Sequence, residues 1–170
     1  MAPDFIAMKV LVCGSRNVGR SSENVHVSLS GQEVAKAGAQ RDFVSSTLTI
    51  LHSECRFSLV IAGDEGGAER LGLHWAQRNG IPTMAVARKK GVLLQKKVED
   101  IKERNLRMLR EGEPQLIVCF GEGENTSRLL AAAQAKGIEA LLFDPFAGAP
   151  PPRAEAPRPP GVVTSAARAR

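Results

Sequence analysis

Short apolar runs alternate along the first 144 residues with longer segments of helical composition. Five runs have the length of strands, four of them contain β-branched residues, and most of them are followed by a glycine or lie near one. They are Lys9–Cys13, Leu59–Ala62, Thr83–Ala87, Leu116–Phe120 and Glu139–Phe143. Runs without polar alternation are typical of strands that are buried on both faces, so the pattern predicts a parallel sheet.

Four segments between these strands have the composition and spacing of helices. They are Arg41–Ser53, Gly67–Asn79, Lys97–Arg110 and Thr126–Lys136, the last with Gly137 expected as its C-cap. Strands that alternate with helices are typical of parallel crossover units. We therefore predict an α/β fold for residues 1–144, a Rossmann-like three-layer sandwich with a mainly parallel sheet of about five strands.

Residues 18–40 do not fit this alternation. Asn24–Ser30 alternates like a strand, and we expect Gly31 and Gly38 to interrupt any helix. The pattern therefore predicts an insertion in this stretch, with either a hairpin-like structure or that of a mobile loop.

Residues 145–170 differ in composition from the rest of the chain. They contain seven of the ten prolines, four arginines and one glutamate. Burial in such a segment cannot offset its ordering entropy, so we predict a disordered tail. The tail carries +3 of the net charge of +5, which leaves the folded part nearly neutral. A nucleic-acid partner is therefore not expected, except through this basic tail.

Length and motifs exclude several classes of protein. The 170 residues suit one domain and lack an apolar stretch of the roughly 18 to 20 residues that cross a membrane, so we expect a cytoplasmic protein without a membrane partner. Cys13, Cys55 and Cys119 have no paired or zinc-like spacing, which indicates buried reduced thiols and no metal site. There is no Walker A, HExxH or GxSxG motif.

Three turn-forming loops follow the first, second and fourth predicted strands. Their candidate ligand-binding residues are Gly14, Ser15 and Arg16 in the first loop, Gly63, Gly66, Gly67 and Glu69 in the second, and Gly121, Gly123, Asn125 and Thr126 in the third. Parallel α/β sheets bind ligands at the carboxyl ends of their strands, where glycines let backbone amides approach a phosphate. Together the loops predict a site for a nucleotide-like ligand.

Carboxylates in the second and third loops modify this prediction. Glu69 and its acidic neighbours either complement the dipole of the following helix or accept hydrogen bonds from ribose hydroxyls. Arg16 can donate a fork of hydrogen bonds to an anion, although a solvated arginine is the structural alternative. We expect Arg16 to be the main anion contact and Arg70 to face solvent.

The third predicted helix contains a run of basic residues whose usual position is a solvated face. They are Lys96, Lys97, Lys102, Arg104, Arg107 and Arg110. Leu106, Met108 and Leu109 are expected to form the buried face of this helix.

Several short motifs occur together in a characteristic order. They are Lys9–Asn17, Gly63–Glu69, Trp75-Ala76 with Gly80, Arg104-Asn105 with Met108, and Phe120–Thr126. In this order the chain resembles the YspA-like, YpsA-related branch of the SLOG superfamily, whose relatives include the LOG enzymes and Smf/DprA. The resemblance implies a Rossmann-like fold, a nucleotide or nucleotide-derived ligand, and a contribution of Arg104 and Asn105 to the ligand site.

The chain departs from the family pattern in both of the later loops. The second loop retains Gly63, Gly67 and Ala68 but ends in Glu69 where the family has aspartate, and the third retains one glycine and Thr126. The catalytic glutamate that LOG-type hydrolases place shortly after that threonine is absent from Ser127–Leu130. The added carboxylates disfavour a tightly held polyphosphate. The missing acid favours ligand binding over fast catalysis.

Three functions remain in consideration. The first is a sensor or accessory protein for a nucleotide-like small molecule, with no further cofactor. The second is a LOG-like nucleoside-monophosphate phosphoribohydrolase in which Glu69, Glu122 or Glu124 replaces the missing acid. The third is a DNA-associated adaptor related in fold to Smf/DprA that uses the tail. The sequence leaves open whether the chain forms a homo-oligomer.

Overall fold

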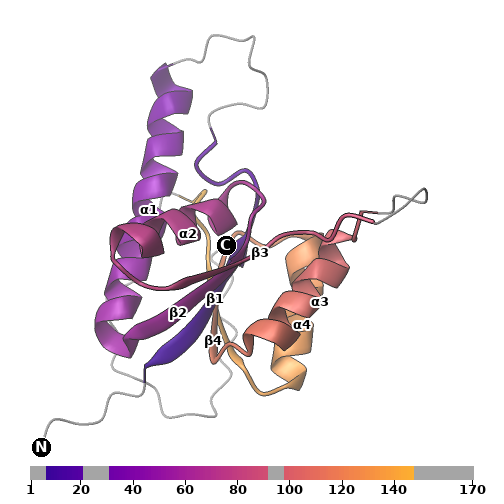
Figure 1. Ribbon diagram of the computed structural model, residues 1–170. Coiled ribbons are helices and arrows are strands. Elements are labelled where there is room, and N and C mark those ends of the chain that lie inside the picture. Colours follow the sequence, from indigo (N-terminus) through magenta and orange to yellow (C-terminus); the bar gives the residue numbers. More distant parts are fainter. Residues whose placement is uncertain (1–6, 21–30, 92–97, 148–170) are drawn as a thin grey trace, which may run out of the picture.

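The computed structural model describes residues 7–20, 31–91 and 98–147. Strands and helices alternate in these residues (Figure 1). In chain order they are β1 (Met8–Gly14), α1 (Gly31–Cys55), β2 (Phe57–Gly63), α2 (Ala68–Arg78), β3 (Thr83–Val86), α3 (Ile101–Gly112), β4 (Leu116–Phe120), α4 (Glu124–Ala135) and β5 (Glu139–Phe143). The predicted α/β alternation is confirmed, with all five strands at the predicted places.

The strands form one parallel sheet in the order β3-β2-β1-β4-β5. β1 is the central strand, and its residues Val10–Val12 are completely buried. After β1, the chain adds β2 and β3 on one side of this strand. It then adds β4 and β5 on the other side. The strand order thus reverses between β1 and β4, and this is the position at which open α/β sheets bind ligands.

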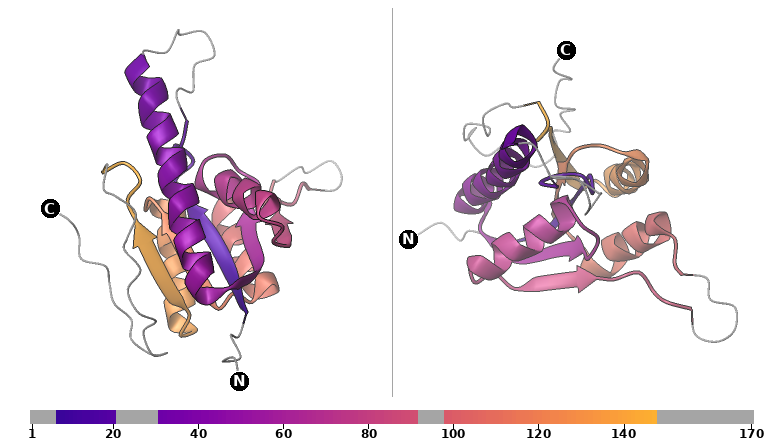
Figure 2. Two further views of the ribbon diagram at one scale, coloured as in Figure 1. Left: turned by 90° about the vertical axis from the view of Figure 1, so that its left-hand side faces the viewer. Right: turned by 90° about the horizontal axis from the view of Figure 1, so that it is seen from above.

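The helices cover both faces of the sheet, as Figure 2 shows. Val44 and Leu48 of α1 pack with Trp75 of α2 in one core cluster. Met108 of α3 and Leu129 of α4 belong to a second cluster on the opposite face. The predicted three-layer sandwich is therefore confirmed.

α1 begins earlier than the sequence pattern predicts. Residues 31–40, expected in an insertion, form its first turns, which extend beyond the sheet in Figures 1 and 2. Two hydrogen bonds attach this part of the helix to the loop after β1: the Gly19 amide donates to Gln40 Oε1, and Arg41 Nη1 donates to the Gly19 carbonyl, both over 2.8 Å. These contacts offset the low helix propensity of glycine. The strand-like run of residues 24–30 lies outside the described residues.

The buried face of α3 also differs from the prediction. Met108 and Leu109 are buried as expected, but Leu106 is 40% exposed and Arg104 and Arg107 are buried. Two arginines replace the expected apolar side chain because each has a carboxylate partner inside the fold.

The partner of Arg107 is Glu99. Arg107 donates to both carboxylate oxygens of Glu99, over 2.7 and 3.0 Å, and to the Ala87 carbonyl over 2.7 Å. Hydrogen bonding by Arg107 lowers the pKa of Glu99 to about 2. Arg107 therefore joins the second half of α3 to Glu99, which precedes the helix, and to Ala87, which follows β3.

Three further predictions concern the cysteines, a membrane-spanning helix and the segments that the structure does not describe. Cys13 and Cys119 are buried free thiols, and Cys55 is a half-buried one. Among the described residues, no helix has the length and apolar character needed to cross a membrane. The start predicted for the third helix at Lys97 and the tail from residue 148 onward lie outside the described residues.

The helical environment of Gly38 leads to a stability prediction. A Cβ atom at this position would have Arg41 Nη2, at 3.9 Å, as its nearest neighbour, so alanine fits without strain. Gly38→Ala should stabilise the protein by about 0.5 to 1 kcal/mol in urea unfolding, because alanine loses less backbone entropy in a helix. Gly72→Ala in α2 is the contrasting variant, because its Cβ would lie 2.8 Å from Val12 Cγ1 and should destabilise the core. A Gly38→Ala variant of lower stability would contradict the helical assignment.

Candidate functional site

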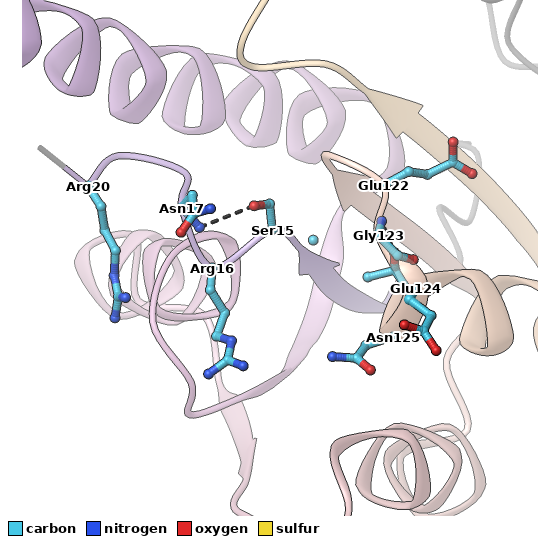
Figure 3. A pocket seen from close by; sticks show the side chains of 10 residues that line it. Ser15, Arg16, Asn17, Arg20, Glu122, Gly123, Glu124 and Asn125 are labelled. Carbon is cyan, nitrogen blue, oxygen red and sulfur yellow. Dashed lines mark hydrogen bonds between the residues drawn. The ribbon is translucent and has the colours of Figure 1, made fainter. Parts of the chain in front are cut away.

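A cleft of about 400 Å³ lies at the carboxyl edge of the sheet between the loops that follow β1 and β4. Figure 3 shows the two loops facing each other across it. The residues that line it on one side are Gly14, Ser15, Arg16, Asn17 and Arg20, at the end of β1 and in the first loop. Those on the other side are Glu122, Gly123, Glu124, Asn125 and Thr126, in the third loop and at the start of α4. The structure thus brings together the first and third of the three predicted loops.

Close packing of β1 against β4 holds the first loop. Gly14 has a φ of +146°, and a Cβ atom there would lie 2.1 Å from the Phe120 carbonyl oxygen. The Ser15 amide donates to the same carbonyl over 2.9 Å. Ser15 Oγ accepts from the Asn17 amide over 3.1 Å, which leaves the hydroxyl proton available to a ligand.

The other side of the cleft is the first turn of α4. Gly123 is its N-cap, and no side-chain capping bond is formed to the first-turn amides. The Thr126 hydroxyl accepts from the Gly123 amide over 2.8 Å and donates to the Gly123 carbonyl over 2.9 Å. Thr126 therefore shapes the turn, while the amides at the start of α4 provide the positive end of the helix dipole.

The second loop lies beside the first loop and does not line the cleft. β2 pairs with β1 on the side opposite β4, so the loop after β2 is one strand away from the cleft. Gly67, with a φ of +73°, leaves room for the first loop, because its Cβ would lie 2.4 Å from the Ser15 carbonyl oxygen. The Ala68 amide donates to that oxygen over 3.1 Å. The glycines here allow contact between loops.

Two further glycines of the second loop leave space for arginine side chains. A Cβ at Gly63 would lie 1.6 Å from Arg104 Nη1, and one at Gly66 would lie 2.1 Å from Arg20 Nη2. Arg20 also lines the cleft, so the second loop contacts a residue of the cleft wall.

Glu69 and Arg104 form a buried ion pair below the loops. Arg104 donates to Glu69 over 2.7 and 3.3 Å and to the Val86 carbonyl over 3.1 Å, and its Nε has no partner. The two residues are 6% and 1% exposed. Burial raises the pKa of Glu69, and the Arg104 guanidinium opposes this shift. Both residues were predicted to bind ligand, yet in this structure they contact each other and lie outside the cleft lining.

Asn105 supports the cleft from behind. Its side-chain amide donates to the Asn125 carbonyl over 3.2 Å, its Oδ1 is buried without a partner, and the residue is 3% exposed. Asn105 therefore links α3 to the first turn of α4 and is not itself in the cleft lining.

Arg16 is placed where an anion can reach it. Its side chain is 55% exposed, and Nη1 lies 3.8 Å from a Glu65 oxygen. The other Glu65 oxygen lies 4.0 Å from Arg88 Nη1. At these distances the ion pairs are weak, so Glu65 competes only modestly with a ligand for Arg16.

The carboxylates of the third loop extend away from Arg16. Glu124 pairs with Lys102 over 2.6 Å, and this hydrogen bond lowers the pKa of Glu124. Glu122 points away from the first loop, whereas the Asn125 amide points across the cleft toward Arg16 (Figure 3). The cleft is therefore cationic along one wall and polar or acidic along the other.

Asn17 lines the cleft without having been among the predicted ligand-binding residues, and so does Arg20. Arg20 lies in the 18–40 stretch, which was assigned to an insertion. A usable signal was present, because a second arginine four residues after Arg16 in a strand-to-helix loop is well placed for an anion.

Neither a metal centre nor a reactive thiol is evident at this edge of the sheet. The described residues contain no group of three or more metal-ligating side chains. Cys13 and Cys119 are opposite each other on β1 and β4. Their hydrogen bond and burial raise the pKa of Cys13 well above its ordinary value, which disfavours the thiolate.

No family model and no curated protein matches this chain.

The buried ion pair leads to a stability prediction. Glu69→Gln should destabilise the protein by about 3 to 5 kcal/mol in urea unfolding at pH 7, because the buried Arg104 guanidinium loses its counter-charge. The double variant E69L/R104M should recover most of this loss, since no buried charge remains. Equal stability of Glu69→Gln and the parent protein would contradict the structural role assigned to the pair.

Proposed function

We propose that this protein binds a nucleotide or a nucleotide-derived small molecule in the cleft between the loops after β1 and β4. In this proposal it acts as a sensor or accessory protein. The observation that carries the proposal is the joint placement of Arg16, Arg20 and the α4 N-terminus around one cleft at the reversal of strand order. The resemblance to the SLOG superfamily supports the same ligand class.

The anionic group of the ligand occupies the side of the first loop. Arg16 and Arg20 provide two guanidinium groups there, and Ser15 provides a hydroxyl donor. From across the cleft, α4 provides first-turn amides that receive no hydrogen bond from an N-cap side chain. Guanidinium forks and helix N-termini both favour phosphate or carboxylate. One such group suits the site better than a polyphosphate, because Glu122 and Glu124 lie on the opposite wall.

The wall that carries Glu122 and Glu124 suits the sugar of a nucleotide. Carboxylates accept hydrogen bonds from ribose hydroxyls, as acidic residues do in other nucleotide-binding α/β folds. Asn125 adds an amide that both donates and accepts and that points into the cleft (Figure 3). The charge difference between the walls therefore sets the direction in which a phosphorylated sugar binds.

Arg16→Ala tests the anion contact. We expect the affinity to fall about tenfold to one hundredfold, because a charge-assisted hydrogen bond is lost. The measurement is titration calorimetry with nucleoside mono- and diphosphates, NAD⁺ and ADP-ribose, after native mass spectrometry has identified any small molecule that copurifies.

Arg70→Ala is the matched control, because Arg70 is exposed on α2 and does not line the cleft. It should leave the affinity unchanged. Glu65→Gln should raise it slightly by releasing Arg16. If no compound of the set binds, or if Arg16→Ala binds as tightly as the parent protein, the proposed site is wrong.

Hydrolysis of the N-glycosidic bond is a second candidate function, favoured by the two carboxylates in the cleft. Glu124 is paired with Lys102 and Glu69 is buried with Arg104, so Glu122 is the remaining candidate to activate water. Its side chain points away from the first loop in Figure 3 and would have to turn toward the ligand. In this reaction water adds to the sugar C1′, and the base leaves with a proton. Incubation with nucleoside monophosphates should then release free base, and Glu122→Gln should lower the rate about 100-fold or more. A protein that binds these compounds and releases no base would exclude this candidate.

The DNA-adaptor hypothesis rests on the basic tail, of which residues 148–170 lie outside the described part of the chain. None of the contacts in the described residues favours it over ligand binding.

A further inference from the structure

Phe146 is an exposed aromatic side chain at the carboxyl edge of the sheet. It is 49% exposed, whereas Phe57, Trp75 and Phe120 are each at most 5% exposed. Phe43 and Phe143 pack against Phe120 in the core. Within the described residues, Phe146 makes no ring contact with another aromatic side chain, so core packing does not explain its position.

Two hydrogen bonds fix the turn that carries Phe146. The Gly121 amide donates to the Phe143 carbonyl over 2.9 Å and holds the end of β5 beside the third loop. The Phe146 amide donates to Asp144 Oδ1 over 2.9 Å, which closes the turn after the strand. The side chain is therefore presented by an ordered turn at the edge where the cleft lies.

The position of Gly121 shows how close Phe146 lies to the cleft. A Cβ built on Gly121 would be 3.1 Å from Phe146 Cε2 and 3.2 Å from Ser15 Cβ. Ser15 lines the cleft. The phenyl ring and Ser15 therefore flank the same glycine. The ring is not one of the residues that line the cleft, and it lies beside the cleft on the Gly121 side.

The residues that line the cleft include no aromatic side chain. Their side chains are polar or charged, apart from the glycines. Ligand sites usually combine a few polar groups with apolar or aromatic walls. Phe146 supplies the component that the lining lacks, and it lies against Gly121, which directly precedes Glu122 on the wall assigned to the sugar.

We propose that Phe146 is a specificity-determining residue that stacks on the aromatic base of the ligand. This inference rests on the proposed function, because it assumes that the anionic group of the same ligand is held at Arg16 and Arg20. Base–aromatic stacking tolerates different bases, so Phe146 selects ligands that have a base over those that have only a phosphorylated sugar. The anion site anchors the ligand, and Phe146 adds affinity for its other end.

The test compares ligands with and without a base on the parent protein and on variants of Phe146. The probes are AMP, GMP, CMP, UMP and ribose 5-phosphate, measured by titration calorimetry. At least one nucleotide should bind more tightly than ribose 5-phosphate, and Phe146→Ala should weaken that nucleotide by about 5- to 100-fold. The affinity for ribose 5-phosphate should not change. Phe146→Trp should retain the preference, and Phe146→Leu should lose most of it.

Leu106→Ala is the matched control, because it removes an exposed apolar side chain from α3, outside the cleft lining. It should leave all affinities unchanged. If Phe146→Ala weakens nucleotides and ribose 5-phosphate equally, or affects neither, the stacking role is wrong while the anion site stands. If no probe binds the parent protein, the proposed function is wrong as well, and the inference falls with it.

Discussion

The parallel pairing of β1 with β4 is the constraint on which the candidate site depends. The two strands are in register from Val10 and Leu116 to Gly14 and Phe120, so the loops that follow them begin side by side. The contact is close enough that any side chain at Gly14 would collide with the Phe120 carbonyl. Because the chain extends the sheet in opposite directions from β1, no crossover helix fills the space above this pair. A cleft at this point follows from the topology.

Burial of charge beneath the loops is the second feature that holds the site together. Arg104 and Glu69 join α3 to α2, and Arg107 and Glu99 join α3 to the chain after β3. A buried ion pair contributes little net stability but allows few alternative arrangements, because any other packing would leave a charge unpaired. The glycines at Gly63 and Gly67 give these side chains and the first loop the space they occupy. The second loop thus acts as a support for the first.

The sheet could be predicted from the sequence, because apolar runs such as Leu116–Phe120 are buried on both faces and stand out from their surroundings. The start of α1 could not, since Gly31 and Gly38 lower helix propensity and the bonds to Gly19 that compensate are tertiary. The pairing of Arg104 with Glu69 spans 35 residues and has no local signal. Likewise, the sequence indicates three similar loops after three of the strands. Which two of them share a cleft could not be predicted, because this depends on the order of the strands in the sheet.

Under the proposed function, the polarity of the cleft assigns its two ends to different parts of the ligand. In the first loop, Arg16 is only loosely paired, because the nearest Glu65 oxygen lies 3.8 Å from its Nη1. On the opposite wall, Lys102 compensates Glu124, so that wall offers hydrogen-bond acceptors with less net negative charge than its sequence suggests. Desolvating one phosphate against two arginines and a helix N-terminus is favourable, whereas each further phosphate would approach the acidic wall and lose that advantage. A ligand with a single anionic group at one end and hydroxyl groups at the other therefore matches the cleft better than a polyphosphate chain does.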